Sequence, residues 1–141
     1  MDRELCAKLL SYVNRKDWWH VPPADPKAYE RRGKFLASTF RDAEFYGRPL
    51  DLPLRVTIRK PLVGDERTIA RVLRIPPQRP GMSLKQIAQH DARWRNAALA
   101  KGYDSILLMA PKSFAAFKAS GKIPRGLELN VLSPSRTKEV G

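Results

Sequence analysis

The spacing of apolar residues divides the first half of the chain into short elements. Leu5, Leu9 and Val13 recur at helical spacing, whereas Leu54 and Val56 alternate with polar residues, as in a half-buried strand. Together with the turn residues between them, these patterns predict a helix over 2–15, strands over 18–21, 34–38 and 54–60, and a short helix between 39 and 47.

In the second half of the chain, capping and turn residues mark the boundaries of the elements. Pro61 is expected to end the strand before it, and Ser83 with Gln86 has the spacing of a capping box. That box starts the longest helix, which ends at Gly102, and its buried stripe is predicted to be Leu84, Ile87, Trp94 and Ala98. The remaining predictions are helices over 65–73 and 113–120, strands over 105–109 and, as the last strand, 127–132, and a mobile loop over 76–81.

The order of these elements favours an α+β fold. Helices and strands are intermixed, but several connections are too short for the crossovers that join parallel strands. We therefore expect a mixed or antiparallel split sheet with helices packed against it. A chain of 141 residues can form one compact core, and we expect an N-terminal helix over 1–17, a single domain over 18–132 and a polar tail over 133–141.

The chain is strongly basic, because 27 Lys and Arg residues stand against 14 Asp and Glu residues, a formal net charge of +13. This balance favours an anionic partner, whether a nucleic acid, an acidic protein surface or a phosphate-bearing ligand. The basic residues occur singly or in pairs along the chain, so they do not form a disordered basic arm. A charge that serves only solubility is the alternative interpretation.

Several classes of protein are disfavoured. No apolar run approaches the roughly 20 residues that cross a bilayer, and Asp2 and Glu4 stand where a signal peptide is basic, so we expect a cytoplasmic protein without a membrane partner. Cys6 is the only cysteine, which excludes an intrachain disulfide, and it is expected to pack as a small apolar side chain. Since the chain has only 2 histidines in addition to this cysteine, it offers too few Cys and His ligands for a metal site of that kind, and no metal cofactor is expected. The motifs of common hydrolases and P-loop enzymes do not occur.

The segment 33–47, GKFLASTFRDAEFYG, combines a strand, a turn with small hydroxyl residues and a capped helix. Thr39 is a good N-cap with Asp42 three residues later, and Gly47 is a natural helix end. Such a turn can present hydroxyl groups and an aromatic face to a ligand. An ordinary connection between a strand and a helix explains the same pattern equally well.

The histidines differ in their surroundings. His90 lies in the middle of the long helix beside Asp91 and Arg93 and is expected to be solvated. His20 follows two tryptophans on a predicted strand, where it either forms hydrogen bonds that close the strand end or donates one to a ligand. The spacing leaves both readings open. Asp104 is expected to be a turn residue.

Five segments follow one another in an order that resembles ADP-ribosyltransferase domains: WWHVPP, GKFLASTFRDAEFYG, LRVTIRKPLV, GYDSILLM and LELNVLSPSR. The similarity is greatest to the small domains of phage polyvalent proteins and of phage-encoded anti-CRISPR transferases, and it spans residues 18–138. The chain departs from the family pattern in one place, where prolines between 22 and 26 replace the usual polar, HGT-like continuation of the first motif.

The resemblance implies a split mixed sheet that holds NAD as a substrate. It implies that His20 ends the first strand and binds the adenosine-side ribose, and that Ser38 and Thr39 form the second motif. Phe35 or Tyr46 is the aromatic residue that would stack on the nicotinamide ring.

Glu128 matches the third position of the family, an acidic residue at the start of the last strand. Cleavage of the bond between nicotinamide and ribose passes through a transition state of oxocarbenium character, and a fixed carboxylate stabilises its positive charge. The alternative is an exposed strand glutamate that pairs with a neighbouring Lys or Arg.

Basic residues cluster around Tyr29, namely Arg31, Arg32 and Lys34. Tyr29 and Arg32 are expected to contribute to NAD binding, and the basic group could contact either the pyrophosphate or an anionic target. The implied function is a mono-ADP-ribosyltransferase that modifies a macromolecule, such as a host protein or nucleoprotein complex if the chain is phage-encoded. The alternative is a non-catalytic basic inhibitor or nucleic-acid-binding protein, with its tryptophans as stacking platforms.

Overall fold

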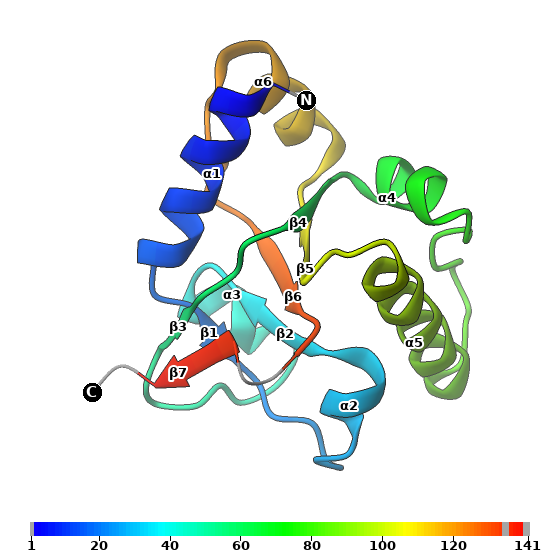
Figure 1. Cartoon of the computed structure of the whole chain (residues 1–141). Helices are drawn as coiled ribbons and strands as arrows, with labels where there is room; N and C mark the ends of the chain where they lie inside the picture. The colour runs from blue at the N-terminus through cyan, green and yellow to red at the C-terminus, as the bar shows by residue number, and fades with distance from the viewer. Residues whose placement is uncertain (1, 134–135, 140–141) are drawn as a thin grey trace.

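A mixed five-stranded sheet forms the centre of the molecule (Figure 1). The computed structural model describes residues 2–133 and 136–139. Across the sheet the strand order is β1 (Trp19–His20), β2 (Lys34–Ala37), β6 (Glu128–Val131), β5 (Ser105–Leu108) and β4 (Pro61–Gly64). Only β4 and β5 are parallel within this sheet, and its other neighbours are antiparallel. A second, two-stranded antiparallel sheet consists of β3 (Leu54–Val56) and β7 (Thr137–Glu139). The predicted mixed sheet of an α+β fold is therefore confirmed.

The helices begin where the sequence offers capping groups. They are α1 (Arg3–Arg15), α2 (Ala28–Arg32), α3 (Phe40–Glu44), α4 (Glu66–Leu73), α5 (Leu84–Ala100) and α6 (Pro111–Ser120). The side chains of Thr39 and Asp65 accept hydrogen bonds at the starts of α3 and α4. Ser83 and Gln86 form the predicted capping box of α5. None of the helices in the described residues is long and apolar enough to cross a membrane.

Each face of the central sheet has its own hydrophobic cluster. Residues that lie opposite one another in neighbouring strands share a face, so the register puts Leu36, Leu129 and Leu107 on one side. That side packs against α1, α6 and β3. On the other side, Leu62 and Ile106 pack against α4 and α5, and in Figure 1 these two helices lie across the sheet from α1.

The helix over 2–15 is integrated into the core. Leu9 and Val13 are buried in the same cluster as Leu129. The indole nitrogen of the fully buried Trp18 donates to the carbonyl of Val13 at 2.9 Å, and the Trp18 backbone pairs with Leu54. Trp18 therefore links α1, β1 and β3. At the other end of the chain, the segment predicted to be a polar tail contains β7.

The strand predicted over 54–60 is shorter than expected, because a side chain of α1 takes the place of a neighbouring strand beyond Val56. β3 ends at Val56, although Ile58 still points inward. The Asn14 amide accepts from the Ile58 backbone N–H at 3.0 Å and donates to its carbonyl at 2.9 Å. The prediction that Pro61 ends this strand is wrong, because β3 already ends at Val56 and Pro61 is the first residue of β4, a position where a missing N–H is tolerated.

Three burial predictions are also wrong. Leu84 is 86 % exposed, because the first turn of α5 extends beyond its apolar neighbours, and Cys6 is exposed on α1. His90 is 7 % exposed, because the loop between α4 and α5 folds over it and the Pro76 carbonyl accepts from its ring. A second bond, from Gln78 to Asp91 at 3.0 Å, ties the loop predicted to be mobile to α5.

Candidate functional site

The three strands that carry the resemblance lie next to one another in the central sheet. β2 separates β1 from β6, and Ala37 is paired with Trp19 on one side and with Glu128 on the other. These three residues therefore share one face of the sheet. His20 is paired with Leu36 and so belongs to the opposite face. The strand order brings the predicted positions together, but the pleat separates His20 from Glu128.

Glu128 is a largely buried acid at the start of the middle strand. Burial raises the pKa of its carboxyl group, and the negative charges of Asp91 and Glu66 raise it further. Partial burial raises the pKa of the Tyr46 phenol, and the negative charge of Glu128 raises it further. Tyr46 therefore lies within electrostatic reach of Glu128. A carboxylate in such surroundings is costly for the folded protein, and groups of this kind are enriched at functional sites.

Several aromatic side chains of β2, α3 and the segment after α3 remain partly open to solvent. Phe35 and Phe40 are 37 % and 38 % exposed, and Tyr46 is 65 % exposed. Trp19 packs edge-on against Phe40 at 5.2 Å between ring centroids, which fixes α3 beside β1. Exposed aromatic side chains are thus available on these segments of the chain.

Ser38 serves the structure of this region and has no free hydroxyl group. Its Oγ donates to the Arg125 carbonyl at 2.8 Å and accepts from the Leu127 backbone N–H at 3.2 Å. Its own carbonyl accepts from the Lys16 ammonium group at 2.5 Å. Ser38 is 2 % exposed, so it positions the start of β6, and with it Glu128, rather than a ligand.

Thr39 caps α3 and borders a surface hollow. Its Oγ1 accepts from the Asp42 backbone N–H at 3.0 Å. The hollow has a volume of about 360 Å³ and is lined by Thr39, Arg41, Asp42, Arg125 and Gly126. Two guanidinium groups therefore lie at the edge of the chain segment that leads into Glu128.

His20 forms hydrogen bonds through both ring nitrogens. Its Nδ1 lies 2.7 Å from the Phe35 carbonyl and its Nε2 lies 2.9 Å from the Tyr29 hydroxyl. Because a carbonyl only accepts, Nδ1 carries the proton and Tyr29 donates to Nε2. With 3 % of its surface exposed, His20 ties β1, β2 and α2 together and has no free nitrogen for a ligand in this arrangement.

The pH dependence of stability should reveal this histidine. Burial lowers the pKa of His20, opposed by its bond to Phe35 and aided by the charge of Lys34. The unfolded chain therefore binds a proton at higher pH than the folded one, so stability is lost as pH falls from about 6.5. Chemical denaturation across this range should show a weaker loss for His20→Gln, which keeps a donor and an acceptor but does not titrate. Parallel curves for the two proteins would contradict the assignment.

The basic group around Tyr29 is mostly engaged elsewhere. Arg31 pairs with Asp25 at 3.2 Å, and the Lys34 ammonium group donates to Thr137 at 3.1 Å. Arg32 lies on α2, which packs against α5, and its charge acts on Asp91.

Asp91 is the acid of this region that the sequence analysis did not identify. Burial raises the pKa of its carboxyl group, against the lowering effects of Gln78, His90 and Arg32. Its neighbour His90 was expected to be solvated, and neither His90 nor Asp91 was assigned to the buried stripe predicted for this helix. Only the packing of α2 and the loop before α5 reveals that this acid is partly buried, and its charge acts on the pKa of Glu128.

The chain was compared with known proteins at the levels of family, sequence and structure. No family model, curated protein or solved structure matches it. Its function therefore has to be inferred from its own residues. Within residues 2–133 and 136–139, no group of three or more His, Cys, Asp or Glu side chains is arranged to hold a metal ion.

Proposed function

We propose that this chain is an NAD-dependent mono-ADP-ribosyltransferase in which Glu128 stabilises the transition state. The observation that carries the proposal is the position of Glu128, largely buried at the start of the middle strand, on the face of the sheet that it shares with Trp19, and within electrostatic reach of Tyr46. The adjacency of β1, β2 and β6 supports it, because the resemblance draws its three motif positions from these strands. We propose the cytoplasm as the place of action, that of the host if the chain is phage-encoded.

The proposed reaction begins with cleavage of the bond between nicotinamide and the ribose anomeric carbon. The bonding electron pair leaves with the nicotinamide nitrogen, and the sugar develops positive charge that the Glu128 carboxylate stabilises. An acceptor group on the target then attacks the anomeric carbon and loses its proton. Phe35, Phe40 or Tyr46 would hold the flat nicotinamide ring by stacking.

The rest of NAD needs donors other than His20, whose nitrogens are both engaged. We propose that Arg41 and Arg125 fill this role for the pyrophosphate. They line the hollow next to the segment that leads into Glu128, and a guanidinium group binds phosphate oxygens in a bidentate manner. The basic residues near Tyr29 are less suited, because Arg31 and Lys34 already have partners.

The test is the incubation of the purified protein with NAD labelled in its adenosine half, with and without a cell lysate. A specific labelled protein or nucleic acid, together with release of nicotinamide, is the expected result. If neither product forms at high protein concentration and long incubation, the enzymatic proposal is wrong.

A basic, non-catalytic nucleic-acid-binding protein is the second candidate. In the part of the chain that the structure describes, the only Lys or Arg side chains that pair with a carboxylate are Arg31 with Asp25 and Arg55 with Asp17. Most of the positive charge thus faces solvent. For this candidate, affinity for DNA or RNA should fall steeply with salt, with a slope set by the number of phosphates contacted. Affinity independent of salt would contradict it.

A further inference from the structure

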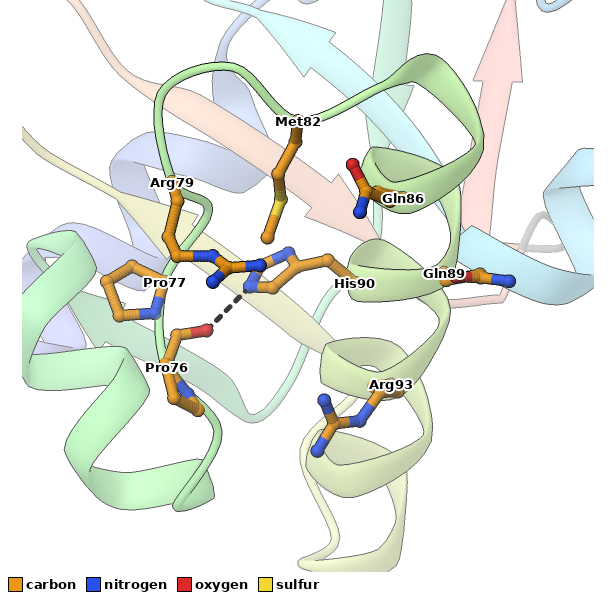
Figure 2. Close-up of a pocket in the computed structure, with 8 residues that line it drawn as sticks. All are labelled: Pro76, Pro77, Arg79, Met82, Gln86, Gln89, His90 and Arg93. Carbon is orange, nitrogen blue, oxygen red and sulfur yellow. Dashed lines mark hydrogen bonds between the residues drawn. The ribbon is translucent and has the colours of Figure 1, made fainter.

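A second surface hollow lies between α5 and the loop that precedes it, and none of the residues proposed above for NAD lines it. Its volume is about 330 Å³, at the lower end of the range for small-molecule sites. In Figure 2 the loop lies beside α5, Arg79 and Met82 reach from the loop toward His90, and Arg93 extends from α5. Pro76, Pro77, Gln86 and Gln89 complete the lining.

The hollow combines unpaired positive charge with apolar lining residues. Within the described residues, neither Arg79 nor Arg93 forms an ion pair or a hydrogen bond through its guanidinium group. Pro77 and Met82 also line the hollow and provide its apolar contact area, and both are partly buried. Two guanidinium groups beside an apolar wall match a ligand that has both a phosphate and a flat ring.

His90 provides an independent observation at the base of the hollow. Its ring is more than nine-tenths buried, and its Nε2 donates to the Pro76 carbonyl at 2.9 Å. Its other nitrogen, Nδ1, is buried without a hydrogen-bond partner, and the nearest acidic oxygen, on Asp91, lies 3.5 Å away. Unsatisfied buried polar atoms are rare in folded proteins, and this one belongs to a residue that lines the hollow.

We propose that this hollow binds a nucleotide, with its phosphate on Arg79 and Arg93 and its base against Pro77 and Met82. The nucleotide is either free or part of a single strand, and the chemistry of recognition is the same in both cases. None of the residues proposed for NAD lines this hollow, and the proposal does not depend on transferase activity.

Trp94 allows binding to be measured on the whole chain without a label. Its ring lies 4.6 Å from the His90 ring between centroids, and its indole nitrogen donates to the Ile75 carbonyl at 3.2 Å. A ligand that contacts His90 should change the fluorescence of Trp94. The probes are AMP, adenosine and a single-stranded oligodeoxyadenylate of about twelve nucleotides, which fits the usual site size of single-strand binders.

We expect AMP to bind at least tenfold more tightly than adenosine, because only AMP offers the two guanidinium groups a phosphate for charge-assisted hydrogen bonds. The double variant Arg79→Gln with Arg93→Gln should lower AMP affinity at least tenfold. The matched control is Arg3→Gln on α1, which lies far from α5 in Figure 1 and should leave affinity unchanged.

The source of the nucleotide follows from the ratio of affinities. If the oligonucleotide binds more than tenfold more tightly than AMP, the ligand is a single-stranded nucleic acid. If the two affinities are similar, the ligand is a free nucleotide. The proposal is overturned if AMP does not bind at millimolar concentration, if it binds no better than adenosine, or if Arg3→Gln weakens it as much as the double variant. Circular dichroism of each variant guards against loss of the fold.

Discussion

Replacing Glu128 with glutamine is expected to lower NAD-dependent labelling and nicotinamide release by about 10²–10³-fold, the usual effect of removing one electrostatic stabiliser of a transition state. Glutamine has nearly the same shape but carries no charge, so it cannot stabilise the developing cation. Because burial raises the pKa of Glu128, the rate of the unmodified protein should also rise with pH through a pKa above the ordinary value of about 4.3. The measurement is the pH profile of nicotinamide release.

The same substitution is expected to stabilise the fold at neutral pH. A raised pKa in the folded state means that the charged carboxylate is less stable there than in the unfolded chain. Stability from this group is therefore complete below its unfolded pKa and is lost as pH rises through the folded value. Glu128→Gln should unfold at higher denaturant concentration than the unmodified protein at pH 7, and the two should converge in acid.

The matched control for both effects is Glu4→Gln, which removes the same charge from the exposed start of α1. It should change neither the rate nor the stability by more than about 0.5 kcal/mol. Full labelling activity in Glu128→Gln would exclude this residue as the transition-state acid. A loss of activity together with a loss of stability would indicate a structural role instead.

Replacing Trp18 with alanine is expected to cost about 3–5 kcal/mol, a large share of the roughly 5–15 kcal/mol that stabilises a domain. Trp18 is among the largest fully buried side chains. Its removal would leave a cavity between α1, β1 and β3, and the Val13 carbonyl would lose its donor. The midpoint of chemical denaturation measures the effect.

Two further variants separate the causes. Trp18→Phe keeps an aromatic ring but not the N–H, so it should cost less than the alanine variant, about 1–3 kcal/mol. Leu84→Ala removes an apolar side chain that is 86 % exposed and should have almost no effect. If all three variants unfold at the same denaturant concentration as the unmodified protein, α1 and Trp18 are not part of the cooperative core.

Local signals in the sequence were sufficient for most elements of this fold. Thr39 and Ser83 start helices because a side-chain oxygen meets an orphan N–H within three residues, an interaction that depends on nothing distant. The boundaries that failed depend on long-range contacts. β3 stops at Val56 because Asn14 occupies the Ile58 backbone, and β7 is recognisable only once β3 is available as its partner.

The candidate site was also predictable only as far as local signals reach. Glu128 could be placed at the start of a strand from the pattern alone, and its strand indeed lies next to β2. The face on which His20 would lie could not be foreseen, because it depends on the register between β1 and β2, and a shift of one residue would reverse it. Asp91 was missed because the burial of α5 at that point comes from α2 and the preceding loop.

The position of β6 between β2 and β5 has a consequence for biosynthesis. Both neighbours of this strand emerge from the ribosome before it does, and until residues 128–131 follow, each exposes an open hydrogen-bonding edge. Before β6 is translated, the nascent chain can form only two separate parts of the central sheet, β1 with β2 and β4 with β5. β6, the last strand of this sheet to be translated, joins the two parts. The same strand brings Glu128, so an interrupted translation product should be prone to aggregation and should not act on NAD.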